Sequence, residues 1–453
     1  MRSLILLASF VGYSLPMFAK PFIGVLVWIW IAVGTPHLES YGITRTLQAN
    51  FAVAVLTLFM WMIAKKEMRA YKNPAVIVIY IIILLMIVSN YTGAAVDYST
   101  PFLARTLKII TLSFVLLGLV NNRIRIHACL WILAISLGYY GAKAGLGTLA
   151  TGGSYRVSGP EGGPIGDNNY TAAAFIMILP ILYYLRTESK VKAVRMMILG
   201  VMLLCLVGIL GTYSRGGFLG LASMMIFFWV RSKQKFRNFI IVIVILLVGA
   251  SLMPQKYYDR LSTIETAAEE DSSFIGRIYA WEAALKIANS RFLGVGFRAY
   301  EVPEVFSKYK SEEFWKERLA MHSIFFEVLA DLGYIGLIFY LLLCFLSWRN
   351  LIWVKEHTAA DPRFKWANNC VRMIEISFAG FIVTGAALSM AYFEPLWVLI
   401  AISVAIRCIV ERTLEAEEVQ RRRALWQPQA VSAGAGAAPS WPRPQSLRGP
   451  AAG

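Results

Sequence analysis

The sequence contains few charged residues. Asp, Glu, Lys and Arg make up 16% of its 453 positions, whereas a typical soluble domain has about 25%. Hydrophobic residues make up 58% of the chain, and the mean hydropathy is +0.59. The apolar residues gather in runs of about 16 to 25, the length that a helix needs to cross a hydrocarbon core of about 30 Å. This composition excludes an ordinary soluble protein and predicts an all-α polytopic membrane protein.

Histidine and cysteine are also scarce, with four and five residues. None of the cysteines shows the spacing of a metal site, and none lies in segment 254–322, where an oxidising compartment would form disulfides. The sequence has no Asp-x-Asp motif and no histidine cluster, so we expect no metal and no cofactor. We interpret the cysteines as small apolar packing residues; they are Cys129, Cys205, Cys344, Cys370 and Cys408.

The apolar runs predict about 12 transmembrane helices. The first 34 residues hold two short runs separated by "PMFAKP" at 16–21, and form either one broken span or two short ones, which gives 12 or 13 in all. No A-x-A-like cleavage site follows the first run, so we expect no removed signal peptide. The later spans are expected at 47–64, 74–90, 101–120, 126–145, 169–186, 194–212, 215–231, 237–253, 323–348, 370–391 and 395–411.

The net charge of +17 is concentrated in a few loops. Basic clusters at 65–72, 123–125, 190–195 and 231–237 alternate with loops almost free of Lys and Arg, such as 90–100. This alternation follows the positive-inside rule rather than nucleic-acid binding, and it orients the basic loops and the C-terminus toward the cytoplasm. With the C-terminus inside, 12 spans also put the N-terminus inside, and we favour that number.

The predicted spans divide the chain into four parts. These are N-terminal transmembrane helices at 1–253, a large outer, periplasmic loop at 254–322, C-terminal transmembrane helices at 323–412, and a Pro-, Ala- and Gly-rich cytoplasmic tail at 424–453. The composition of the tail predicts disorder. A second outer loop at 147–169, rich in Gly, Ser and Pro, is expected to be irregular. Apolar residues at helical spacing predict a helix over 276–289 in the large loop, ended by "GVGF" at 294–297.

The stretch "GTYSRGG" at 211–217 places Arg215 at a turn between two apolar helices. An arginine at the centre of a span costs about 2.5–3.5 kcal/mol, and less at the interface. One interpretation is therefore an interfacial anchor, or an arginine that caps helix carbonyls. The other is an anion site, because Gly216 and Gly217 let a phosphate approach the backbone, where the N–H groups of 216–218 are expected to be unpaired. The residues alone leave both open.

His322 lies in "MHSIFFEVLADLGYIG" at the mouth of a span, on the same outer side. A lone histidine is more often a structural hydrogen-bonding residue. A titratable imidazole at the rim of a membrane cavity is also suited to take a proton from a hydroxyl. Arg277 is either a surface residue whose stem covers Trp281 or a second phosphate clamp, and Arg291 and Arg298 compete for that role.

Three segments occur in a fixed order: "TYSRGG" after a span, "GRIYAW…LGVGF" in the large outer loop, and "MHS…EVLADLGYIG" opening the next span. In this order, and with about 12 spans, the chain resembles the bacterial O-antigen ligase and O-antigen polymerase superfamily, which includes some O-linked protein oligosaccharyltransferases. The resemblance is strongest over residues 190 to 350. The length and the N-terminal half also resemble the O-glycosylation ligase branch that is associated with exosortase systems.

The resemblance implies a metal-independent, inverting glycosyltransferase of the GT-C type in the bacterial inner membrane, with its active site facing the periplasm. Its donor would be a glycan on undecaprenyl pyrophosphate, and its acceptor a hydroxyl of a glycan, lipid or protein. In the family, an arginine of the "SRG" motif and one of the large loop engage the pyrophosphate, and a histidine at the end of that loop activates the acceptor. By motif these roles fall on Arg215, Arg277 and His322.

Two alternatives stay open. The first is a polymerase, whose acceptor is another lipid-linked glycan. The second is a transporter that flips a lipid-linked glycan or exports polysaccharide. Transporters often contain inverted repeats and discontinuous helices with charges inside the membrane. No such repeat is evident here, and the residues singled out above lie on one side. Lipid A core, protein and a growing polysaccharide all remain as acceptors.

Overall fold

A computed structural model of the chain describes residues 2–40, 49–231, 235–236, 272–312, 314 and 320–426, and every structural statement below concerns these residues. They form helices and connecting turns, without a strand in the described part. The chain divides into two compact units, residues 1–410 and 411–453. The predicted all-α fold is confirmed. The predicted span at 237–253, the first part of the large loop and the tail from residue 427 onward lie outside the described residues.

The N-terminal part contains six α-helices and two 3₁₀ helices among its described residues. They are α1 (Arg2–Ala19), α2 (Pro21–Gly34), η1 (Pro36–Glu39), α4 (Ala49–Ile63), η2 (Met68–Lys72), α5 (Pro74–Tyr91), α6 (Val96–Leu119) and α7 (Arg123–Ala150). The first 34 residues form two helices, because Lys20 is extended and Pro21 occupies the first position of α2, which proline suits. Asn73 and Asn122 cap α5 and α7 through their side-chain oxygens.

The following part of the chain contains the helices that carry the predicted site. They are α8 (Asn168–Glu188), α9 (Lys192–Gly211), α10 (Arg215–Arg231), α14 (Ser272–Ser290), η3 (Ala299–Glu301), α15 (Pro303–Phe306), α16 (Ile324–Thr358), η4 (Pro362–Phe364), α17 (Lys365–Gly385) and α18 (Glu394–Trp426). The outer loop predicted at 147–169 is irregular from Thr151 to Asp167.

One predicted boundary is wrong. The span expected at 370–391 ends at Gly385, and residues 386–393 form a loop of tight turns before α18. The loop is apolar, so its composition matches that of a helix. Its backbone N–H groups instead form hydrogen bonds of tight turns or bond to a side chain. The Ala391 N–H donates to the Glu327 carboxylate, for example. We call residues 386–393 the α17–α18 loop.

Six described helices are long and apolar enough to cross a membrane; they are α5, α6, α7, α8, α9 and α16. Two shorter helices, α2 and α4, are also apolar. This supports a multi-pass membrane protein, whereas the total of 12 spans stays a prediction.

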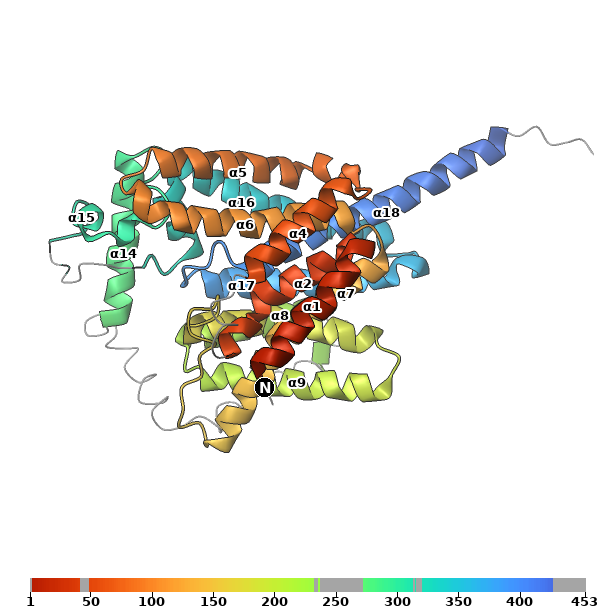
Figure 1. Ribbon diagram of the computed structural model, residues 1–453, viewed down its shortest axis with the longest axis horizontal. Coiled ribbons are helices and arrows are strands. Elements are labelled where there is room, and N and C mark those ends of the chain that lie inside the picture. Colours follow the sequence, from red (N-terminus) through yellow and green to blue (C-terminus); the bar gives the residue numbers. More distant parts are fainter. Residues whose placement is uncertain are drawn as a thin grey trace, which may run out of the picture. The chain divides into compact units, whose positions relative to one another are not determined.

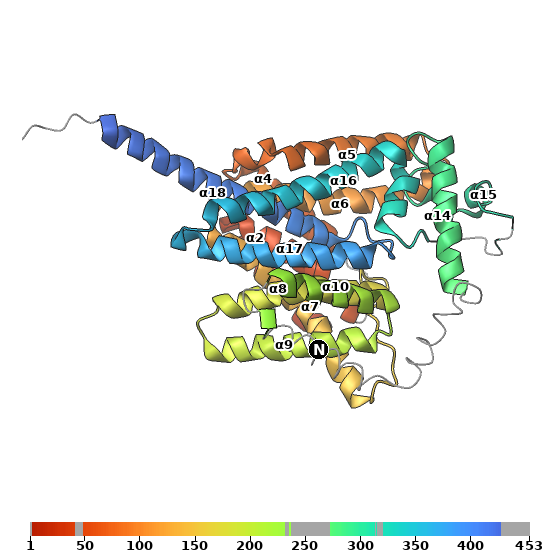
Figure 2. The same cartoon turned by 180° about the vertical axis from the view of Figure 1, so that it is seen from behind.

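Helix α8 lies at the centre of the first unit, between α7, α9, α10 and α17 (Figures 1 and 2). Every residue from Thr171 to Leu182 is buried, which is typical of a helix that is apolar on all sides. A second group packs α5 and α17 against α16. Helix α14 runs across one end of these helices rather than along them, and packs on the start of α16 (Figures 1 and 2).

At one end of the helices in the first unit, ion pairs join α7, α8, α10, α16 and α17. Arg123 pairs with Glu188 at 2.9 Å. At the same end Arg231 and Lys355 both pair with Glu375, at 2.9 and 2.8 Å. The other end holds loop 151–167, the turn before α10, α14 and the α17–α18 loop. The described part of the second unit is the charged end of α18, residues 411–426, in which Glu418 pairs with Arg422.

Helix α16 contains a break that separates its first turns from the long remainder. Gly333 has φ +68° and ψ −170°, outside the helical region. A Cβ at this position would lie 2.1 Å from the Phe292 carbonyl oxygen. Glycine is therefore required both for the left-handed backbone and for the close approach of the chain that follows α14. The segment Ile324–Leu332 can in this way take its own direction at the end of the bundle.

Candidate functional site

Arg215 is the first residue of α10, and the turn before it is fixed to the start of α8. The Ser214 hydroxyl donates to Asn169 Oδ1 at 2.7 Å, and Asn168 Nδ2 donates to the Thr212 carbonyl at 2.9 Å. Arg156 in turn donates to Asn168 Oδ1 at 2.7 Å. The "SRG" turn is thus held by side chains of a buried helix rather than by the loop alone.

The expectation of unpaired N–H groups at 216–218 is wrong for two of the three. The Gly217 N–H donates to Ser214 Oγ at 2.9 Å, and the Phe218 N–H donates to the Ser214 carbonyl at 2.9 Å. Ser214 therefore acts as the N-cap of α10 and takes up donors that a phosphate would need. Gly217 also has a packing role, because a Cβ there would lie 2.6 Å from Ala172 Cβ of α8.

Gly216 faces a different neighbour. A Cβ added to it would meet only Ala387 and Ser214, each at 4.0 Å. Gly216 is half-buried and lies beside the α17–α18 loop, with room for a group that approaches the backbone. Of the two glycines predicted to admit a phosphate, the geometry suits Gly216 better than Gly217.

His322 precedes α16 and contacts the α17–α18 loop. Its backbone N–H donates to Ser389 Oγ at 2.8 Å. The residue has a left-handed backbone, with φ +48°, and Ser323 then caps α16 by accepting from the Phe325 N–H. His322 and Gly216 are therefore both next to the α17–α18 loop, His322 by a hydrogen bond to Ser389 and Gly216 by its approach to Ala387.

Helix α14 carries Arg277 toward this region. The predicted helix over 276–289 is confirmed, and it extends from Ser272 to Ser290. Trp281 lies one turn after Arg277 and donates its indole N–H to the Met321 carbonyl at 3.0 Å. Its ring stacks on that of Phe326, with 5.1 Å between the ring centres. Arg277 therefore lies on the helix that holds the residue immediately before His322.

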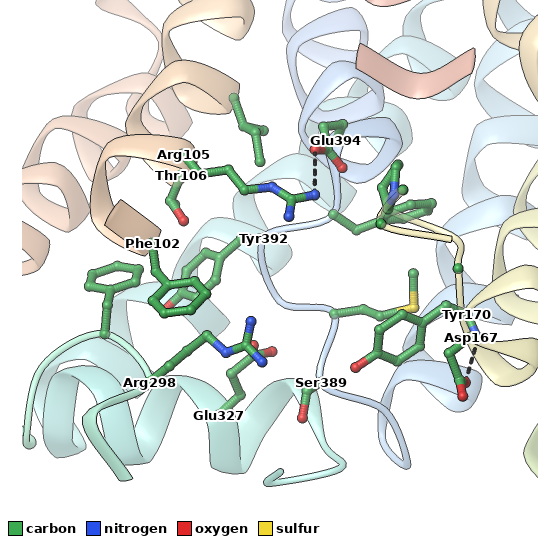
Figure 3. Close-up of a pocket in the computed structure, with 18 residues that line it drawn as sticks. Phe102, Arg105, Thr106, Asp167, Tyr170, Arg298, Glu327, Ser389, Tyr392 and Glu394 are labelled. Carbon is green, nitrogen blue, oxygen red and sulfur yellow. Dashed lines mark hydrogen bonds and ion pairs between the residues drawn. The ribbon is translucent and has the colours of Figure 1, made fainter. Parts of the chain in front are cut away.

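A cavity of about 350 Å³, which we call the first cavity, is lined in part by the α17–α18 loop (Figure 3). Its walls come from α6, loop 162–167, α8, the segment after α14, α16 and the α17–α18 loop. Ser389, which binds the His322 backbone, is part of its wall. Of the arginines and histidine predicted for the site, Arg298 lines this cavity, whereas Arg215, Arg277 and His322 do not.

The structure separates the two competing arginines. The Arg298 guanidinium faces the first cavity, binds Glu301 at 2.8 Å through Nε, and lies 4.6 Å from the centre of the Phe102 ring. Arg291 instead donates to the Thr92 carbonyl at 3.1 Å. Arg291 thus ties the end of α14 to the end of α5, and it is not part of the cavity wall.

Two buried carboxylates beneath the cavity join the loops that form it. Glu327 accepts the Ala391 N–H at 2.9 Å. Asp331, which is 0% exposed, accepts the Arg298 N–H at 2.9 Å and the Tyr392 hydroxyl at 3.1 Å. Glu327 also faces the first cavity (Figure 3). Both residues lie on the short segment of α16 before the break at Gly333, so this segment orients both the segment after α14 and the α17–α18 loop.

One ion pair in the wall of the first cavity was not predicted from the sequence. Arg105 on α6 lies 3.7 Å from Glu394, the first residue of α18, and both line the first cavity (Figure 3). The sequence did carry a signal for these residues, since an ionisable residue inside an apolar run is costly and usually functional. Glu327, Asp331 and Glu394 also fit that rule. Ser389 carried no such signal.

The three segments that carry the predicted site residues each contain a residue with a left-handed backbone. The described residues include four non-glycine positions with positive φ, namely Thr35, Tyr213, Arg298 and His322. Such a conformation costs on the order of 1–3 kcal/mol and is concentrated at active sites and ligand clamps. Three of the four lie in the "SRG" turn, after α14 and before α16. The strain therefore coincides with the three segments in which the sequence places its candidate residues.

Comparison with protein-family models identifies two parts of the chain. Residues 200–341 match the family described as O-Antigen ligase, and residues 1–190 match a family of unknown function, DUF5935. A search among curated proteins found no similar sequence. The first match covers Arg215, α14 and His322 and implies transfer of lipid-linked glycans. The chain is therefore a multi-pass membrane protein with an O-antigen ligase domain at residues 200–341, preceded by a domain of unknown function.

Proposed function

We propose that this protein is an inverting, metal-independent glycosyltransferase that moves a glycan from undecaprenyl pyrophosphate to an acceptor hydroxyl. The reaction would take place at the periplasmic face of the bacterial inner membrane. The observation that carries the proposal is the strained backbone of His322, bonded to Ser389 in the cavity wall within an O-antigen ligase domain. The O-glycosylation ligase branch associated with exosortase systems is the form of this enzyme that we favour.

The arginines would bind the leaving group. A pyrophosphate carries several negative oxygens, and a planar guanidinium can bind two of them at once. Arg215 begins α10 beside the half-open position of Gly216, and we assign it to the pyrophosphate together with Arg277 of α14. These fixed guanidinium groups stabilise the leaving group most strongly in the transition state, when negative charge develops on it. They supply that charge stabilisation without a bound metal.

His322 would serve as the general base. The acceptor oxygen attacks the anomeric carbon on the face opposite the pyrophosphate, and His322 takes the hydroxyl proton. The bond from the anomeric carbon to the pyrophosphate oxygen breaks, and its electron pair leaves with undecaprenyl pyrophosphate. This single displacement inverts the anomeric configuration. It requires no pair of catalytic carboxylates, unlike the hydrolysis of glycosides.

The first cavity would receive sugar units next to the reacting centre. Its wall combines aromatic rings with carboxylates and arginines; these include Phe102, Tyr170, Tyr392, Glu327 and Arg298. Apolar walls with a few placed polar groups are typical of small-molecule sites. Ser389 connects this cavity to the His322 backbone, which supports an assignment of both to one site.

The test is a transfer assay in proteoliposomes with purified protein, an undecaprenyl-pyrophosphate glycan and a panel of acceptors. We expect His322→Ala to reduce transfer by about 10²–10⁴-fold, the usual contribution of a general base, while donor binding is retained. His357→Ala is the matched control, since His357 is an exposed residue that bonds the Trp353 carbonyl near the opposite end of α16. Full activity of His322→Ala would leave His322 with a structural role.

The same assay separates the alternatives. Addition of a single glycan to a lipid or protein acceptor supports a ligase, and a ladder of products built from the donor alone supports a polymerase. Release of undecaprenyl pyrophosphate must accompany either reaction. If the donor crosses the bilayer without any transfer, the transporter replaces the transferase and Arg215 becomes a head-group site.

A further inference from the structure

A second cavity of about 250 Å³ adjoins the first and lies largely in the N-terminal part of the chain, outside the O-antigen ligase domain. Its walls come mainly from α2, η1, α4 and α6. The Arg105–Glu394 pair stands in the shared wall, where Figure 3 shows it from the side of the first cavity. The residues common to both cavities are Arg105, Ile109, Gly162, Pro164 and Glu394.

Two buried polar atoms in this second cavity lack a hydrogen-bond partner within the described part of the chain. They are His37 Nδ1 and Asn50 Oδ1, and both residues line the cavity. A buried polar atom without a partner carries a free-energy penalty, and most such atoms in native proteins are satisfied. Two of them in the wall of one cavity, on η1 and at the start of α4, indicate a ligand that supplies the missing bonds.

The wall that carries His37 is held in place by several contacts. Thr35, which also lines the cavity, is the fourth of the strained residues, with φ +37°. Glu39 accepts from Lys143 of α7 at 2.8 Å, and the Ser40 hydroxyl donates to the His37 carbonyl at 2.8 Å. Before His37, the Tyr140 hydroxyl donates to the Gly34 carbonyl at 2.7 Å, so the turn after α2 is fixed on both sides of His37, as expected of a preorganised binding site.

The chemistry of the two atoms selects the ligand. Burial lowers the pKa of His37, so its ring is neutral at neutral pH and has one donor and one acceptor nitrogen. The Asn50 Oδ1 atom is an acceptor only. The hydroxyls of a sugar satisfy both atoms, because a hydroxyl can donate to the amide oxygen and can donate to or accept from an imidazole nitrogen. A phosphate would pair with Arg105 or Lys108 in the wall, but as an acceptor it would leave Asn50 Oδ1 without a donor. A hydrocarbon tail would leave both atoms unpaired.

The remaining walls suit a sugar ring. Trp28, Ile31, Leu38 and Leu112 provide apolar surface, against which the C–H faces of a pyranose can pack. Arg105, Lys108 and Glu394 also line the cavity, so the hydroxyls of the sugar meet charged hydrogen-bonding groups as well as His37 and Asn50. The volume is below the roughly 300–1,000 Å³ of pockets for drug-sized ligands, so the occupant is small.

We propose that the second cavity is a glycan subsite that holds one hydroxyl-bearing sugar unit of a substrate, with His37 and Asn50 as its hydrogen-bonding residues. The assignment rests on the proposed function, because a transferase of lipid-linked glycans presents such units at this end of the protein. Continuity with the first cavity lets a single glycan extend past Arg105 and Glu394 into both. The subsite gives the domain of unknown function a task in selecting the glycan.

The test measures binding separately from transfer. Saturation-transfer difference NMR is recorded on the full chain in nanodiscs with a panel of methyl glycosides, comprising the glucoside, galactoside, mannoside and N-acetylglucosaminide. We expect at least one glycoside to bind the wild type and His322→Ala equally. The double variant His37→Phe, Asn50→Leu should bind it about fivefold more weakly or worse, as expected for two lost hydrogen bonds. Each single variant should show part of this loss and serves if the double variant does not fold.

The control is the double variant His357→Phe, Asn289→Leu, which changes two exposed residues that line neither cavity. Its affinity should equal that of the wild type. Absence of binding to every glycoside, or unchanged affinity in the His37 and Asn50 variants, would overturn the subsite.

The transfer assay then identifies which substrate fills the subsite. A raised KM for the donor alone assigns its glycan to the cavity, and a raised KM for the acceptor alone assigns the acceptor's sugar. Glycoside binding without any transfer would reject the proposed function and keep the subsite as a sugar site. Transfer with an unchanged KM for both substrates in the double variant would keep the function and reject the subsite.

Discussion

Arg215 owes its position to contacts that it does not make itself. Ser214 and Thr212 bond to Asn169 and Asn168, so the turn that presents the guanidinium is anchored to the buried helix α8. Tyr213, inside the turn, has a left-handed backbone with φ +53°. This rigid turn allows the geometry of the guanidinium, and not only its charge, to matter.

We therefore expect Arg215→Lys to impair transfer by about tenfold or more, because an ammonium group keeps the charge but loses the planar fork that binds two oxygens. The loss should appear mainly in kcat if the arginine acts on the leaving group. The measurement is the rate of undecaprenyl pyrophosphate release as the donor concentration is varied.

Arg195→Lys is the matched control for this variant. Arg195 is exposed and lies at the start of α9, so its replacement should leave both kcat and KM unchanged. Wild-type transfer by Arg215→Lys would remove the pyrophosphate role from this residue.

Single residues could be found from the sequence where an unusual chemical group stood out. Arg215 and His322 were proposed in this way, as a charge and a titratable ring at the ends of apolar runs, and their roles stay predictions. Ser389 could not be found, because its bond to His322 joins residues that are 67 positions apart. Glu327 and Asp331 stood inside a quoted motif, but their partners become known only from the folded chain.

Among the elements, the first turns of α16 have the widest influence on the site. Asp331 accepts one hydrogen bond at each carboxylate oxygen, from the Arg298 N–H and from Tyr392. Glu327 uses one oxygen, Oε2, for the Ala391 N–H. The segment thus fixes two loops that are remote from it in sequence.

This arrangement predicts different costs for two similar substitutions. Asp331→Asn replaces one acceptor oxygen by a donor, so one of the two partly buried donors, the Arg298 N–H or the Tyr392 hydroxyl, loses its acceptor, at a cost of about 1–3 kcal/mol. Glu327→Gln can turn its amide oxygen to the Ala391 N–H and should cost less. The measurement is the apparent melting temperature of each purified variant in the same detergent. Equal melting temperatures for Asp331→Asn and the wild type would show that Asp331 does not hold the loops together.

The elements themselves were largely predictable, because apolar runs and capping residues are local features. The loop helix over 276–289 and the break at "GVGF" were expected from periodicity, and both are present. Two local errors have physical causes. Ser214 was not recognised as the N-cap of α10, although serine is a preferred capping residue. The α17–α18 loop was assigned to a helix because a buried loop can be as apolar as a helix.

At the scale of the whole molecule, the order of the helices agrees with the charge pattern. On the basic side, Arg123 pairs α7 with the end of α8, and Arg231 of α10 and Lys355 of α16 both pair with Glu375 of α17. The candidate residues are all at the opposite end. Arg231 closes α10 at the basic end, and α14 packs at the other, which is what a span at 237–253 predicts. The cytoplasmic assignment of the basic end remains a prediction from the positive-inside rule.

That orientation can be tested with single cysteines in a variant whose five native cysteines are replaced. Ser154→Cys and Ser307→Cys place exposed thiols at the proposed periplasmic end, and Lys190→Cys places one in a basic loop. In intact spheroplasts, a membrane-impermeant maleimide should label the first two thiols and should reach the third only after lysis. The reverse pattern would put His322 and Arg215 in the cytoplasm, where a donor in the outer leaflet could not reach them. Because the proposed reaction needs the donor and these residues on the same side of the membrane, this labelling decides whether the proposed site can meet its substrate.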